Sequence, residues 1–167
     1  MSRRHALRVG LSLALLLCVG QVSAREVAPG ADVPPAPSTY RGEAVVTGVA
    51  DGDTLYADID GRSIRIRLAQ IDAPEKAQAL RELVGKKKVQ LWWKSLDRYG
   101  RPIAQISVDG LDVNAEQVRR GFAWVFLRYS KDAALIALEA QAKSAGLGLW
   151  ADPHPVPPWE WRASRRE

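Results

Sequence analysis

The fold is decided by residues 54–68, which read TLYADIDGRSIRIRL. Apolar and polar residues alternate on both sides of Asp60-Gly61, and an Asp-Gly pair between two alternating runs is typical of a tight β-hairpin turn. In the second run three aliphatic side chains share one face, and Arg65 and Arg67 lie on the other. The stretch therefore predicts two antiparallel strands with one buried and one basic face.

The segments around this hairpin predict the rest of a small barrel. Further strands are expected at residues 43–49, 88–93 and 102–108, and the Trp92-Trp93 pair in the second of these should place one indole inward and one outward. Five short strands with about three helices indicate an α+β, β-rich fold, namely a five-stranded OB-fold barrel. Barrels of this type often bind nucleic acids or sugars.

The helices are expected between and after the later strands. Ala77, Leu80 and Val84 form a helical stripe of about two turns. Asn114 and Gln117 resemble a capping box that opens a short helix. A longer helix is expected over residues 133–144, with a glycine as its stop signal.

Composition and charge narrow the class of protein. The chain has 167 residues, is 47% hydrophobic, and contains one Cys and two His. It is too apolar for a disordered chain, the single Cys excludes an internal disulfide, and the few Cys and His argue against a four-ligand zinc site. Residues 25–61 carry two basic and seven acidic side chains, whereas residues 62–131 carry fifteen basic and seven acidic. The basic middle segment predicts an anionic partner.

The two ends of the chain differ from the middle. Residues 1–24 combine a basic start, an apolar run and the small residues Val22-Ser23-Ala24, which is the layout of a cleavable signal peptide. We therefore expect a secreted or periplasmic protein without stable membrane association, the alternative being an uncleaved anchor. Residues 25–39 are a Pro-rich linker, 40–162 the domain and 163–167 a tail, and monomer is the default state.

The Pro-rich segment before Trp159 and Trp161 allows two interpretations. Pro-rich segments with Trp occur as recognition motifs. Packing of the Trp side chains onto the domain is the interpretation that we favour.

Three clusters carry chemistry: residues 51–54 (DGDT), 67–75 (RLAQIDAPE) and 97–101 (DRYGR). Carboxylates hold hard cations such as Ca²⁺, a further carboxylate can take a proton from water, and arginines bind phosphate oxygens by paired hydrogen bonds. Together the clusters contain the parts of a site that cleaves phosphodiesters.

On these clusters the sequence resembles the staphylococcal nuclease (thermonuclease) family. Further matches follow in family order at residues 114–125, at residues 146–150 and at the closing Trp161-Arg162. The resemblance covers nearly the whole predicted domain. It implies Ca²⁺-dependent hydrolysis of DNA or RNA by water, leaving 3′-phosphate ends.

The resemblance also implies roles for single residues. It assigns Asp53, Asp72 and the Ala73 carbonyl to Ca²⁺, and Glu75 to activation of the attacking water. Arg67 and Arg101 would bind the scissile phosphate, while the substrate-binding positions are Arg98, Tyr99 and Tyr129. Leu127 stands where the family has a second tyrosine, which puts base stacking there in doubt.

One departure from the family leaves a second interpretation open. The segment between Glu75 and Asp97 is shorter than usual, so Asp72 and Glu75, with Pro74 between them, also fit a capping box at a helix start. Glu75 would then fold back onto the Asp72 amide instead of facing water. The alternative functions are accordingly a catalytically inactive nucleic-acid-binding OB module and, more weakly, a sugar-binding domain.

Overall fold

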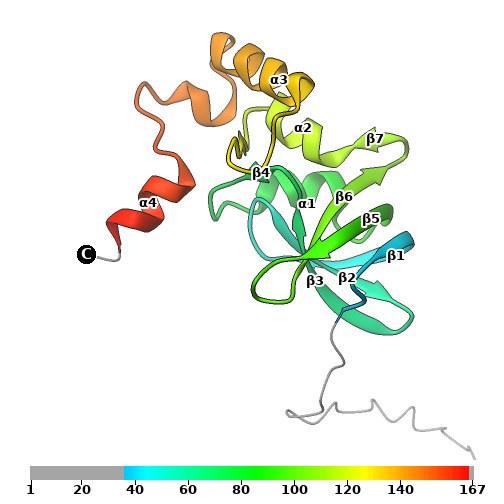
Figure 1. The fold of residues 1–167 in the computed structure, drawn as a ribbon. Helices are drawn as coiled ribbons and strands as arrows, with labels where there is room; N and C mark the ends of the chain where they lie inside the picture. The colour runs from blue at the N-terminus through cyan, green and yellow to red at the C-terminus, as the bar shows by residue number, and fades with distance from the viewer. Residues whose placement is uncertain (1–35, 166–167) are drawn as a thin grey trace, which may run out of the picture. The chain divides into compact units, whose positions relative to one another are not determined.

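The computed structural model describes residues 36–165, and Figure 1 traces the order of their elements. The predicted signal peptide and most of the predicted linker lie outside the described residues. No helix within residues 36–165 is long and apolar enough to cross a membrane. The described part contains every strand and helix that the sequence predicts.

A closed barrel forms the centre of the fold. Its strands are β1 (Tyr40–Val49), β2 (Thr54–Ile59), β3 (Arg62–Leu68), β5 (Lys88–Leu96) and β6 (Pro102–Val108). Neighbours pair antiparallel in the order β3-β2-β1-β5-β6, and a parallel pairing of β3 with β6 closes the ring where Arg67 lies opposite Ile103. The predicted OB-type barrel and all five predicted strands are confirmed.

The quoted hairpin has the geometry that its sequence requires. Asp60 and Gly61 both have positive φ, 53° and 78°, as the two central residues of a type I′ turn do. Ile66 and Leu68 are buried in the core, whereas Arg65 is exposed. The prediction for the tryptophan pair is also confirmed, because Trp93 is 1% exposed and Trp92 is 43% exposed.

Helices and short strands lie between β3 and β5 and after β6. The helices are α1 (Gln78–Val84), α2 (Val113–Arg119), α3 (Ala133–Ser144), the 3₁₀ turn η1 (Gly148–Ala151) and α4 (Pro158–Ser164). The two-residue strands are β4 (Ile71–Asp72), β7 (Leu111–Asp112) and β8 (Trp124–Val125). Three helices match the sequence-based expectation, but α4 and the short strands were not predicted.

The predicted capping box at Asn114 is wrong. The N-cap of α2 is Asp112, whose carboxylate accepts a hydrogen bond from the Ala115 amide. The Asn114 amide is buried and bridges the barrel instead: it donates to the carbonyls of Ala69 and Ala104 and accepts from the amide of Ile106. The side chain therefore joins α2 to the end of β3 and to β6.

Helix α4 packs onto a ribbon formed by β4 and β8. Trp159 stacks on Phe126 with ring centroids 5.5 Å apart and meets Trp124 edge-on at 6.5 Å. This confirms that a Trp of the tail packs onto the domain, although Trp161 remains 39% exposed. The ribbon itself pairs Asp72 with Trp124, so α4 lies beside the strand that carries the Asp72 carboxylate.

Candidate active site

Two buried carboxylates share one arginine at the centre of the candidate site. Arg67 Nη1 donates to Asp53 Oδ1 over 2.7 Å, and Arg67 Nη2 lies 3.2 Å from Asp72 Oδ1. Asp53 is 2% exposed and Asp72 is fully buried. The structure thus brings together three residues that the resemblance assigns to one site, from the start of β2, the end of β3 and the end of β4.

The loop before β2 approaches the segment after β4 closely enough to require glycine. A Cβ at Gly52 would lie 2.7 Å from both the Ala73 Cβ and the Pro74 carbonyl oxygen. The Gly52 amide donates to that carbonyl, and the Ala73 amide donates to Asp53 Oδ2 over 2.9 Å. Gly52 therefore allows the two segments to hold Asp53 beside Ala73.

Burial dominates the electrostatics of this group. It raises the pKa of Asp53 to about 7, against the opposing effects of the Arg67 charge and the Ala73 amide. Burial also opposes the charged guanidinium of Arg67, but the charges of Asp53 and Asp72 outweigh it and raise the pKa of Arg67. The effect of burial on the Asp53 pKa is thus larger than the combined effect of the Arg67 charge and the Ala73 hydrogen bond.

This donor set fits a hard divalent cation. Among the described residues, no three acidic, His or Cys side chains gather closely enough to bind a metal by themselves. The set here is smaller and consists of two carboxylates and the Ala73 carbonyl, which are oxygen ligands of the kind that Ca²⁺ prefers. Both carboxylates are buried, so a bound cation would compensate for their removal from water.

Arg101 lies at the end of the loop that leads into β6. It directly precedes Pro102, the buried first residue of β6, and Ile103 of that strand is the register partner of Arg67. The backbone of Arg101 is therefore two residues before the position that lies opposite Arg67. Its guanidinium forms an ion pair with Asp97 at 2.7 Å in this structure, rather than with the two buried carboxylates.

Glu75 is exposed and precedes the helix, so the capping-box interpretation of this residue is wrong. Helix α1 begins at Gln78, its N-cap is Ala77, and no side chain caps it. The turn between Asp72 and the helix leaves Glu75 on the surface, three residues from the buried Asp72. Its carboxylate is free to meet water there.

The predicted substrate-binding residues fall into two groups. The guanidinium groups of Arg98 and Arg101 lie 4.7 and 5.6 Å from the centre of the Tyr99 ring, which is 68% exposed. Tyr129 is equally exposed, but it contacts Phe126 edge-on in the aromatic cluster beneath α4. The structure thus groups Arg98 and Tyr99 with Arg101 and places Tyr129 in a different cluster.

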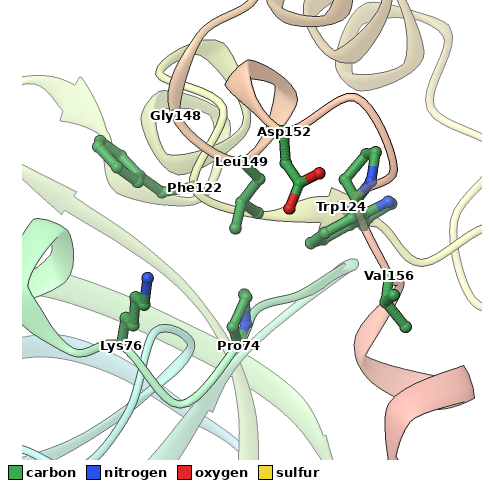
Figure 2. A pocket seen from close by; sticks show the side chains of 9 residues that line it. Pro74, Lys76, Phe122, Trp124, Gly148, Leu149, Asp152 and Val156 are labelled. Atoms are coloured by element: carbon green, nitrogen blue, oxygen red, sulfur yellow. The ribbon is translucent and has the colours of Figure 1, made fainter.

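A pocket of about 270 Å³ opens beside the Glu75 loop (Figure 2). The residues on either side of Glu75, Pro74 and Lys76, form one wall. The other wall comes from Phe122, Trp124, Gly148, Leu149, Asp152, Pro155 and Val156. In Figure 2 the Lys76 ammonium and the Asp152 carboxylate point into this space from opposite walls.

Sequence reasoning missed one residue of the site. Arg162 on α4 donates from Nη1 to Asp72 Oδ1 over 3.3 Å and from Nη2 to Asp72 Oδ2 over 2.5 Å. The two residues are ninety positions apart, so no local pattern could pair them. In the sequence, only the Trp161-Arg162 match with the family pointed to Arg162, and this match did not indicate Asp72 as its partner.

Comparison with known proteins identifies the family of the chain. Residues 65–152 match a family model described as "Staphylococcal nuclease homologue". The chain is 42% identical over 126 residues to an "Uncharacterized endonuclease" of Escherichia coli, covering 70% of this chain and 82% of that protein. It is 37% identical over 151 residues to the "Micrococcal nuclease" of Shigella flexneri, covering 79% and 86%.

A third relative, an "Uncharacterized endonuclease" of Haemophilus influenzae, is 40% identical over 130 residues, with 72% of this chain and 73% of that protein covered. The chain therefore belongs to the staphylococcal nuclease family. The matched model begins inside β3 and ends in the segment after η1. Asp53 and Arg162, which contact Arg67 and Asp72 from the two ends of the domain, both lie outside it.

Proposed function

We propose that this protein is a Ca²⁺-dependent nuclease that hydrolyses phosphodiester bonds of DNA or RNA and leaves 3′-phosphate ends. The observation that carries the proposal is the convergence of the two buried carboxylates of Asp53 and Asp72 on Arg67. The names of the relatives, endonuclease and micrococcal nuclease, support the same reaction class.

Asp53, Asp72 and the Ala73 carbonyl would hold the cation. When bound, the cation supplies positive charge that polarises a phosphate oxygen and lowers the pKa of water beside it. Arg67 and Arg101 would donate hydrogen bonds to the oxygens of the scissile phosphate, and these bonds strengthen as negative charge builds up on phosphorus.

Glu75 would accept the proton of the attacking water. The water oxygen then forms a bond to phosphorus while the bond from phosphorus to the 5′ oxygen breaks, and the departing oxygen takes up a proton from solvent. The exposed position of Glu75 after the turn at Pro74 suits this role, because the carboxylate is not committed to capping α1.

The test is digestion of a single-stranded DNA oligonucleotide by the purified protein, with Ca²⁺ and with chelator. Glu75→Gln should lose at least 100-fold in rate, since a positioned general base contributes about 10²–10⁴-fold. Glu82→Gln is the matched control, because Glu82 is an exposed carboxylate on the adjacent helix. Equal digestion by Glu75→Gln and wild type in both buffers would instead favour an inactive binding module with a contaminating nuclease.

The products of the same digestion test which phosphodiester bond is cleaved. Fragments with 3′-phosphate ends should fail to prime a DNA polymerase until a phosphatase has treated them, and direct priming would contradict the proposed bond cleavage.

We also propose that the protein is exported. Its activity should then appear outside the cytoplasm and should be lost from there when residues 1–24 are deleted.

A further inference from the structure

Arg162 makes the most extensive contact with the buried Asp72 carboxylate. Its two terminal nitrogens form a paired fork with both oxygens of Asp72. Such paired Arg–carboxylate bonds are stronger and more directional than single hydrogen bonds. Arg162 therefore engages both of the oxygens that Asp72 would offer to a cation.

The fork depends on how α4 docks. Trp159 and Arg162 are three residues apart and so lie on one face of the helix. Trp159 packs on the aromatic side chains of Trp124 and Phe126, and Trp124 is the register partner of Asp72 in the β4–β8 ribbon. One face of α4 thus contacts both strands of the ribbon, with the indole on β8 and the guanidinium on β4.

The two arginines on Asp72 are held very differently. Arg67 is also bonded to Asp53 and to the Ile71 carbonyl, and its side chain is 20% exposed. The side chain of Arg162 is 43% exposed, and its hydrogen bonds within the described residues are to Asp72 alone. Of the two, Arg162 can leave Asp72 with little disturbance of the barrel.

We infer that Arg162 sets the cation affinity of this site: it is the counter-ion of Asp72 in the metal-free protein, and it gives up the carboxylate when a divalent cation binds. This inference rests on the proposed assignment of Asp72 as a cation ligand. Arg162 and the cation then compete for Asp72. The binding free energy of Ca²⁺ is therefore less favourable by the free energy of the Arg162–Asp72 pair, and the apparent affinity is lower. Helix α4 becomes an element whose docking depends on metal.

The experiment measures calcium binding by calorimetry on the full chain, without nucleic acid. Arg162→Gln should bind Ca²⁺ about 10-fold more tightly, which corresponds to losing a competing hydrogen-bonded charge pair worth about 1.4 kcal/mol. Arg162→Lys keeps the charge but cannot form the fork, so its Ca²⁺ affinity should lie between those of wild type and Arg162→Gln. Arg165→Gln is the matched control, because Arg165 is exposed one turn later and lies over the Trp161 ring.

A second readout separates this role from a merely structural one. In chelator, Arg162→Gln should unfold at a lower temperature than wild type, because the Asp72 carboxylate then keeps, among residues 36–165, only the 3.2 Å bond to Arg67. In saturating Ca²⁺ the difference should disappear, since the cation replaces Arg162 in both proteins. Trp159→Ala, which undocks the same face of α4, should also tighten Ca²⁺ binding.

The outcomes distinguish the inference from the proposed function. Equal or weaker Ca²⁺ binding by a folded Arg162→Gln would overturn the competition and leave the nuclease assignment intact. Failure of both wild type and Arg162→Gln to bind Ca²⁺ would overturn the cation assignment of Asp72 and the inference with it. A loss of stability in Arg162→Gln that is equal in chelator and in Ca²⁺ would show that Arg162 only supports the fold.

Discussion

Replacing Asn114 by Ala should destabilise the protein far more than the loss of a helix cap. The amide group makes three buried or half-buried hydrogen bonds, to Ala69, Ala104 and Ile106. At about 1 kcal/mol each they contribute about 3 kcal/mol, and leaving the Ile106 amide buried without a partner costs about 1–2 kcal/mol more. We expect the free energy of unfolding to fall by about 3–5 kcal/mol.

Urea denaturation of wild type, Asn114→Ala and Asp112→Ala measures this directly. Asp112→Ala removes the observed N-cap, which should cost about 1 kcal/mol. A similar small loss in both variants would refute the bridging role and would return Asn114 to the capping role that its sequence suggests. A large loss in Asn114→Ala alone supports the role of Asn114 as the connection between α2 and the barrel.

The remaining predictions concern the loops and charges around the site. Gly52→Ala should weaken Ca²⁺ binding by separating the segments that hold Asp53 and Ala73, whereas Gly48→Ala, which has room for a methyl group, should leave calcium titrations unchanged. Hydrogen bonding from Arg119 lowers the pKa of Glu116 to about 2, so Glu116 stabilises the fold above about pH 4.5 and loses this effect as the pH falls toward 2. Urea midpoints across this range should fall less steeply in Glu116→Gln. Arg101→Ala should reduce the cleavage rate far more than the Ca²⁺ affinity, and equal losses in the two assays would mean that Arg101 only supports the fold.

The barrel could be predicted from the sequence because its strands show local alternation of apolar and polar residues. Alternation in residues 54–68 fixes which side chains face the core, and the Asp60-Gly61 turn fixes the register of the hairpin. The same reasoning found α3 with its observed bounds, since an apolar stripe and a glycine stop mark both its packing face and its end.

The parts that escaped prediction depend on partners far away in the sequence. The two-residue strands β4 and β8 are too short to show an alternation of apolar and polar residues, yet their pairing holds Asp72 opposite Trp124. Asn114 carries a helix-start signature, but tertiary hydrogen bonds to the barrel outweigh it. Arg162 contacts Asp72 from a helix that Trp159 packs against Phe126, and no pattern in residues 152–167 predicts a carboxylate partner.

The sequence predicted which residues form the candidate site but not which of them contact one another. The clusters around Asp53, Arg67 and Asp72 do converge, and Glu75 stays free of α1. What the sequence could not show is that arginines contact both buried carboxylates. Under the proposed cation assignment, metal binding would exchange one counter-ion of Asp72 for another.

Calcium binding and DNA cleavage by the carboxylate cluster can be compared in wild type and Asp72→Asn. We predict that the Ca²⁺ concentration giving half-maximal cleavage of single-stranded DNA matches the half-point of calcium binding in wild type. Both signals should be lost in Asp72→Asn. Cleavage that persists in chelator, or an Asp72→Asn variant that cleaves at the wild-type rate, would contradict the assignment of this carboxylate cluster as the catalytic cation site.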